Sequence, residues 1–146
     1  MSTKYESMQG ILRLYELRRD ETMRQARDWF TAFHPTSVED ILNVYRGEEN
    51  VYYRMVTSYW DMACSFVNHG AIDEQMFNDT SFEHIAVFSK VQPFLEELRA
   101  TSGVPQYLRH LEEVVTRMPN SEALIARMRE ITKTLTAARG ASSARG

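Results

Sequence analysis

The sequence predicts an all-α protein, a single-domain bundle of five to six helices around a central buried helix at about residues 48–69. Apolar residues recur at a helical period along nearly the whole chain. Only four prolines and six glycines interrupt it, which favours long helices over many short strands. A chain of 146 residues is long enough to form one hydrophobic core. We expect one helical domain over residues 1–139 and a disordered tail over 140–146, where the sequence is small and polar.

The first expected helix runs from about Tyr5 to Phe33, either continuous or interrupted near Asp20. Its apolar residues fall within about a third of the helical circle. The pair His34-Pro35 ends it, because the residue before a proline avoids the helical region. A short helix should follow, and Ser37 has the spacing of an N-cap for it.

The expected helix at about residues 48–69 should form the centre of the bundle. Its apolar side chains cover more than half of its circumference and leave only a narrow polar strip for water. A helix of this kind normally has neighbours on several sides. Gly70 should end it, since glycine readily adopts the left-handed conformation that follows many helices.

The second half of the chain contains several shorter helical segments. Thr80 and Glu83 have the spacing of a capping box that begins one helix. Pro93 lies inside its apolar pattern and predicts a kink or a break. Pro105 suits the first turn of the next helix. The run Pro119-Asn120-Ser121 separates that helix from the last one.

Charge and composition exclude several classes of function. The net charge of −3 and the sequence pI of about 5.8 disfavour nucleic-acid binding, because such proteins usually carry a basic domain or stripe. No stretch approaches the roughly 20 apolar residues of a membrane span. The single cysteine cannot form an internal disulfide. We therefore expect a cytoplasmic protein with no nucleic-acid partner and no membrane insertion.

Cys64 and His69 have the residue types of a nucleophile and its base, but not the spacing. Five residues along a helix place them about 140° apart. Cys64 lies instead beside Trp60 and Tyr53 on the apolar arc, where a thiol behaves as a small hydrophobic group. The sequence therefore predicts a structural cysteine.

The histidines do not predict a metal site. None of them follows a glutamate at the Glu-x-x-His spacing of helical di-iron proteins. His110 and Glu113 share a helix face, but two ligands do not make a site. We expect no metal and no cofactor. The four histidines are His34, His69, His84 and His110.

Arg19 is the unusual charge of the first helix, because it lies in the middle of the apolar arc. A lone charge there is costly unless it is paired. We expect its guanidinium to meet a carboxylate such as Asp61 or Glu83, or to sit at an opening into a pocket. The other arginines are interpreted as a solvated face, since acidic residues share their sector: Arg13, Arg24 and Arg27 with Glu16, Asp20 and Asp28.

Two other groups are candidate contact residues. Leu14 and Leu17 lie on the polar side of the first helix and together suggest a protein–protein contact. Aromatic residues on the first and central helices either fill the core or line a cavity for an apolar ligand. Those selected as ligand or partner contacts are Trp29, Tyr53, Tyr59 and Trp60.

A series of short motifs extends over about residues 25–115. They are an aromatic-led helix, a His-Gly stop, an apolar-acidic turn and a Pro-aromatic pair shortly before an arginine: Tyr59-Trp60, His69-Gly70, Ile72-Asp73-Glu74, Pro93-Phe94 and Arg99. In this order they resemble a bacterial family of small helical proteins classed as a domain of unknown function. The resemblance implies a helical fold and a bacterial origin, and no activity. Many members carry an N-terminal membrane helix, and this sequence departs from them in lacking one.

The leading functional hypothesis is a non-enzymatic protein-interaction or regulatory module that contacts another protein, or a second copy of itself, through its helix faces. The alternative is a protein that binds small apolar or anionic ligands, with Arg19 as the anion anchor and the aromatic cluster as the pocket. A third hypothesis is an enzyme in which Asp61, Asp73 or His69 meets groups from other helices. No catalytic residue is predicted.

Overall fold

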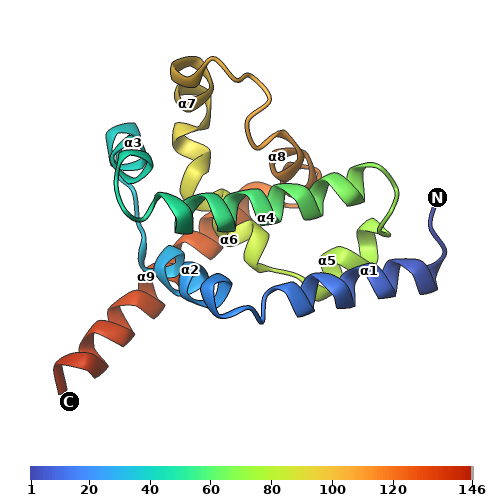
Figure 1. The fold of residues 1–146 in the computed structure, drawn as a ribbon, viewed down its shortest axis with the longest axis horizontal. Helices are drawn as coiled ribbons and strands as arrows, with labels where there is room; N and C mark the ends of the chain where they lie inside the picture. The colour runs from blue at the N-terminus through green and yellow to red at the C-terminus, as the bar shows by residue number, and fades with distance from the viewer. Residues whose placement is uncertain (146) are drawn as a thin grey trace.

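Residues 1–145, which are the residues that the computed structural model describes, form helices and the loops that connect them (Figure 1). No β-strand occurs in this range, and the expected all-α class is confirmed. The elements are, in chain order, α1 (Lys4–Leu17), α2 (Glu21–Ala32), α3 (Val38–Arg46), α4 (Asn50–Asn68), α5 (Glu74–Thr80), α6 (Glu83–Val91), the 3-10 turn η1 (Gln92–Phe94), α7 (Leu95–Ser102), α8 (Arg109–Thr116) and α9 (Ser121–Arg145).

The described residues form more helices than the five to six expected, mainly because two expected helices are divided. The first divides into α1 and α2, and Asp20 is the reason: its carboxylate accepts a hydrogen bond of 3.1 Å from the backbone N–H of Met23 and so begins a new helix. The second divides at Pro93, which lies in η1 between α6 and α7.

α1 begins with a capping box that the sequence reading missed. The Thr3 hydroxyl accepts from the N–H of Glu6 at 3.1 Å, and the Glu6 carboxylate accepts from the N–H of Thr3 at 2.8 Å. The two bonds satisfy N–H groups that would otherwise lack a partner at the helix start. The predicted cap of α3 is present, since the Ser37 hydroxyl accepts from the N–H of Asp40.

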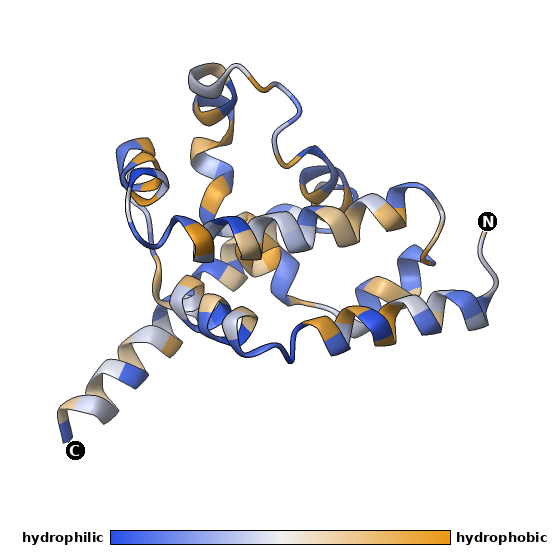
Figure 2. Ribbon diagram, in the orientation of Figure 1, coloured by the Kyte–Doolittle hydropathy of each residue, from blue (hydrophilic) through white to orange (hydrophobic). Residues whose placement is uncertain are grey.

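α4 packs against α2, α3, α5, α6 and α8, and its apolar and polar positions can be followed in Figure 2. Its buried residues are Tyr53, Val56, Thr57, Tyr59, Trp60, Ala63, Cys64 and Val67. The apolar arc is not fully covered, because Val51, Met62 and Phe66 are exposed. Gly70 follows the helix with a φ of 76°, the left-handed conformation expected there.

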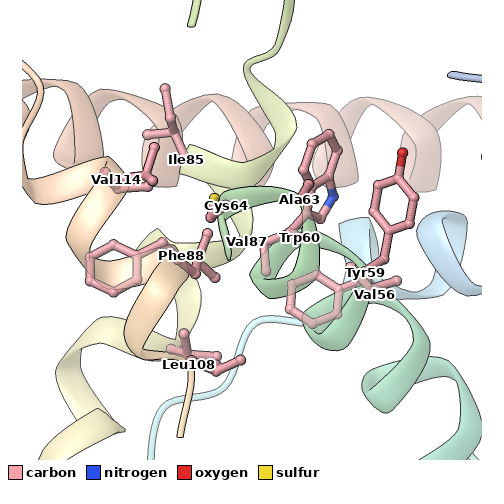
Figure 3. Close-up of a cluster of buried hydrophobic side chains, with 14 of the residues drawn as sticks. Val56, Tyr59, Trp60, Ala63, Cys64, Ile85, Val87, Phe88, Leu108 and Val114 are labelled. Carbon is pink, nitrogen blue, oxygen red and sulfur yellow. The ribbon is translucent and has the colours of Figure 1, made fainter. Parts of the chain in front are cut away.

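Figure 3 shows the part of the core where side chains of α4, α6 and α8 meet Leu108; the core also includes side chains of α1, α2, α3, α5, α7 and α9. Cys64 lies within it and is fully buried. Burial raises the pKa of its thiol, so the sulfur stays protonated at neutral pH. The Nδ1 atom of His69 lies 2.8 Å from the backbone oxygen of Ser65, one turn earlier on its own helix.

Two helix starts differ from the prediction. α8 begins at Arg109 rather than near Pro105, after Leu108 adopts a left-handed backbone with φ of 55°. The expected Thr80–Glu83 capping box is wrong: Phe82 is the N-cap of α6, and no side chain caps that helix. Glu83 is instead engaged by arginines of the first two helical segments.

α9 continues through residues 140–145, where a disordered tail was expected over 140–146; Gly146 lies outside the described residues. Residues 137–145 are all exposed. Within residues 1–145, no helix has both the length and the apolar character needed to cross a membrane.

Candidate functional site

A hollow with concentrated positive charge lies where α1 meets α2. We call it the arginine cleft; its volume is about 690 Å³. Its lining residues are Leu12, Tyr15, Glu16, Arg18, Arg19, Arg24 and Arg27. The bend between the two helices produces it, because Arg18 and Arg19 lie at the bend while Arg24 and Arg27 share one face of α2. Four arginines therefore line one hollow.

Glu83 fixes two of these arginines. The Nε and Nη2 atoms of Arg27 donate to its carboxylate at 3.0 and 2.8 Å, in the two-pronged geometry that guanidinium and carboxylate favour. The Nη1 atom of Arg18 lies 3.5 Å from the same carboxylate. The hydrogen bond to Glu83 raises the pKa of Arg27. Two cations thus share one negative charge.

Arg18 is also held by aromatic rings. Its Cζ atom lies 4.0 Å from the ring centre of Tyr15 and 5.3 Å from that of Trp60. Such stacking stabilises a guanidinium through the negative face of the ring. The Arg18 side chain is only 11% exposed, so its position is set before any ligand arrives.

Arg19 and Arg24 are exposed, and no ion pair within residues 1–145 engages either side chain. Glu16, the acidic residue of the lining, is paired with Arg13 at 3.0 Å. Arg19 therefore lies at an opening, which was one of the two expected environments. Glu83, one of the other expected partners, contacts Arg18 and Arg27 instead.

This arrangement suits the binding of an anion. Guanidinium groups match the planar, two-pronged geometry of carboxylates and phosphates. The lining residues include four arginines and one carboxylate, Glu16, and Glu83 is shared by two of those arginines. Positive charge is therefore concentrated at the cleft in a chain whose net charge is −3.

The aromatic residues predicted as ligand or partner contacts are mainly packed against other side chains. Tyr53 is fully buried, and its hydroxyl lies 2.9 Å from that of Tyr107. Burial raises the pKa of Tyr53. Trp29 is partly buried and stacks on Phe33 with ring centres 4.9 Å apart. These rings pack against neighbouring aromatic side chains of the core.

Trp60 and Tyr59 connect the core to the first helix. Trp60 is buried, and the face of its ring lies beneath Arg18. The hydroxyl of Tyr59 donates to the backbone oxygen of Leu14 at 2.5 Å. Burial raises the pKa of Tyr59 to about 12. Trp60 thus contacts Arg18, one of the residues that line the cleft.

The expected contact pair Leu14 and Leu17 is divided by the structure. Leu14 is 6% exposed and belongs to the core, so its assignment as a surface contact is corrected. The reason is that Leu14 lies on the buried face of α1, where its backbone oxygen accepts the hydrogen bond from Tyr59. Leu17 is the last residue of the helix. Leu17 is 42% exposed and lines a shallow groove of about 610 Å³ with Met55 and Met62 of α4.

The three residues considered for catalysis are each engaged separately. The carboxylate of Asp61 accepts from the N–H of Leu111 at 2.9 Å. Asp73 caps α5 and pairs with Lys4 at 2.7 Å, and these hydrogen bonds lower the pKa of its carboxyl group. His69 contacts its own helix. Over residues 1–145 no three side chains of His, Cys, Asp or Glu are close enough to hold a metal ion.

Arg18, Arg24 and Arg27 are the site residues that sequence reasoning missed. Arg24 and Arg27 were assigned to a solvated face because a continuous helix places them beside acidic residues. The available signal was the density of arginines on both sides of Asp20, a residue type that often begins a helix. A break at that position brings the arginines of two helices together.

The fold and the cleft define a small all-helical domain with a positively charged surface hollow. Residues 5–118 match the model of the domain of unknown function DUF4760, and the chain belongs to this family. The family resemblance noted over residues 25–115 is thereby confirmed. The match includes every residue that lines the cleft, whereas α9 lies beyond it. No curated protein and no solved structure matches the chain.

Proposed function

We propose that the protein is a non-enzymatic binding module that holds a phosphate or carboxylate group in the arginine cleft. The observation that carries this proposal is a hollow lined by four arginines, two of which, Arg19 and Arg24, have no carboxylate partner among residues 1–145. Arg18 and Arg27 are fixed in advance by Glu83, so these two lose little side-chain entropy when an anion binds.

The arginines form two groups, one paired with Glu83 and one unpaired, and this difference supports the proposal. Arg18 and Arg27 are fixed by Glu83 and form the rigid wall of the cleft. Arg19 and Arg24 are free to turn their guanidinium groups toward an incoming anion. Because the cleft is open to solvent, ions screen the attraction over a Debye length of about 8–10 Å. The affinity should therefore fall as salt is added.

The other polar lining groups supply binding rather than chemistry. The Tyr15 hydroxyl donates to the backbone oxygen of Thr80 at 3.0 Å, and Glu16 is paired with Arg13. Neither is paired with a nucleophile, so the cleft lacks the adjacent base and nucleophile on which covalent catalysis depends. This favours a binding role over a catalytic one.

The test is titration of the protein with inorganic phosphate and pyrophosphate by calorimetry. In the double variant Arg19→Gln/Arg24→Gln, we expect the dissociation constant to rise about tenfold, which corresponds to about 1.4 kcal/mol. The effect is modest because water weakens exposed ion pairs. The matched control is Arg46→Gln/Arg127→Gln, which removes the same charge at exposed positions on α3 and α9. Equal affinities of the two double variants, or no binding by the wild type, would refute the proposal.

A second candidate function is the protein-interaction module that the sequence favoured. It is supported by the exposed apolar side chains along α4 and at the end of α1: Leu17, Val51, Met62 and Phe66. Exposed apolar side chains often mark a contact with a partner where they lie together, as Leu17 and Met62 do in one groove. Sedimentation velocity of the wild type and of surface variants tests the case in which the partner is a second copy.

A further inference from the structure

An apolar hollow of about 310 Å³ adjoins the arginine cleft. It lies between α1 and α5, and its lining residues are Met8, Ile11, Leu12, Tyr15, Met76 and Thr80. Leu12 and Tyr15 line both spaces. One surface of the molecule therefore passes from a cluster of positive charge to an apolar depression without leaving α1.

α1 carries exposed apolar residues in addition to those that pack into the core. Ile11 and Leu14 form the buried face of the helix. Met8, Leu12 and Tyr15 are exposed and follow a second face at i, i+4 and i+7. Isolated surface apolar residues are ordinary. A row of three beside a charged cleft is a surface that an apolar ligand would cover.

Tyr15 is the boundary between the two spaces. Its hydroxyl is fixed by the backbone oxygen of Thr80, and the Arg18 guanidinium lies 4.0 Å from its ring centre. The ring is thus held between a cation and the side chains of the apolar hollow. An aromatic ring suits this place because it contacts both cations and alkyl groups.

We infer that the ligand is an amphipathic anion. Its phosphate or carboxylate group binds the arginines, and an unbranched apolar chain lies over Tyr15, Leu12 and Met8 toward Met76. This inference rests on the proposed function and adds the chemical class of the ligand. It requires a ligand with its charge at one end, since the arginines lie on only one side of Tyr15.

The length of α1 sets the length of the chain. Seven residues separate Met8 from Tyr15, a distance of about 10 Å along the helix axis. An extended chain of eight carbons and its ester oxygen spans about the same distance, since each bond of about 1.5 Å advances the zigzag chain by about 1.25 Å. Affinity should therefore increase up to about eight carbons and level off beyond that length.

The experiment measures the binding of ethyl, butyl, hexyl and octyl phosphate by calorimetry, below the concentrations at which they form micelles. We expect the affinity to rise about twofold per methylene, because full burial of a methylene gives about fourfold and this hollow is open on one side. Met8→Gln should weaken octyl phosphate and leave ethyl phosphate unchanged, since Met8 lines only the apolar hollow. Leu135→Gln, an exposed position on α9, is the control and should change neither.

The outcomes separate this inference from the proposed function. Alkyl phosphates that bind with the same affinity at every chain length overturn the inference and leave anion binding intact. Chain dependence that Met8→Gln does not alter also overturns it, because the chain would then lie elsewhere. Failure of every phosphate to bind refutes both.

A second arm identifies the source of the anion. Vesicles of phosphatidylcholine with added phosphatidic acid present the same chemistry in a bilayer. Retention on these vesicles that is lost in both Arg19→Gln/Arg24→Gln and Met8→Gln assigns the ligand to a lipid. Chain-dependent binding in solution without vesicle retention assigns it to a free amphiphile. Retention that depends on the arginines alone overturns the inference, because only the headgroup would then be held.

Discussion

His84 is fully buried between the rings of Phe77 and Trp60, whose centres lie 4.9 and 5.6 Å from the centre of its own ring. Neither ring nitrogen has a hydrogen-bond partner within residues 1–145. Burial disfavours the charged imidazolium and lowers the pKa of His84 to about 3. The side chain is therefore a neutral part of the core at physiological pH.

The lowered pKa of His84 predicts a specific loss of stability in acid. Below about pH 6.5 the unfolded chain takes up a proton that the folded chain does not bind until about pH 3. The free energy of unfolding should therefore fall as the pH falls, by about 2 kcal/mol between pH 6.5 and 5. Urea unfolding at several pH values measures this slope.

His84→Leu removes the titrating group, so its unfolding free energy should depend less steeply on pH over that range than that of the wild type. The control is His69→Gln, which changes an exposed histidine and should keep the wild-type slope. Carboxylates contribute equally to all three proteins, which is why the comparison of slopes is decisive. A His84→Leu slope equal to that of the wild type contradicts the prediction.

At the scale of single elements, the break between α1 and α2 depends on one side chain. Asp20 accepts the hydrogen bond that begins α2, and it is exposed. Asp20→Ala should lower the free energy of unfolding by about 1 kcal/mol, the usual cost of losing an N-cap. Asp20→Ser retains a capping oxygen and removes the charge, and it should stay close to the wild type. Equal losses in the two variants would assign the effect to charge rather than to capping.

The sequence predicts a helix boundary correctly where that boundary depends on residues close to it in the chain. Ser37, Gly70 and Pro93 act through their own backbone or nearest neighbours, and the structure has the cap, the left-handed turn and the break that they predict. The start of α8 depends on distant residues. The hydroxyl of Tyr107, just before this helix, bonds to the hydroxyls of Tyr45 and Tyr53, which are far away in the chain. Leu108 is buried. The sequence pattern around residue 105 therefore does not predict where α8 begins.

The arginine cleft could be predicted only in part for the same reason. Arg19 was singled out from a position on the apolar arc of one continuous helix, whereas in the structure it is exposed in the turn between α1 and α2. The roles of Arg18 and Arg27 depend on Glu83, which is separated from them by 65 and 56 residues. Glu83 has the sequence spacing of a helix cap, and only its contacts with Arg18 and Arg27 in the folded chain show that it binds arginines instead.

At the scale of the whole molecule, the two candidate binding surfaces are separate. The arginine cleft and its apolar extension occupy one side of α1, while Leu17 faces a groove with α4. Anion binding and partner contact therefore use different residues. A variant in one surface leaves the other in place, so the two candidate functions can be measured independently.

The groove at Leu17 predicts weak self-association if a second copy is its partner. Stable dimers bury about 800 Å² per partner, and a few exposed apolar side chains cover only part of such an area. We therefore expect sedimentation velocity to show a monomer at low concentration and a growing dimer fraction at high concentration. Leu17→Ser/Met62→Ser should return the protein to the monomer, because both side chains line the groove.

The control for this experiment is Leu135→Ser, which removes an exposed leucine on α9, far along the chain from the groove, and should leave the dimer fraction unchanged. The phosphate affinity of Leu17→Ser/Met62→Ser should equal that of the wild type, since neither residue lines the arginine cleft. A wild type that stays monomeric at millimolar concentration excludes the second copy as the partner. In that case a contact through this groove would require a different protein, because the exposed apolar side chains would still lack a cover.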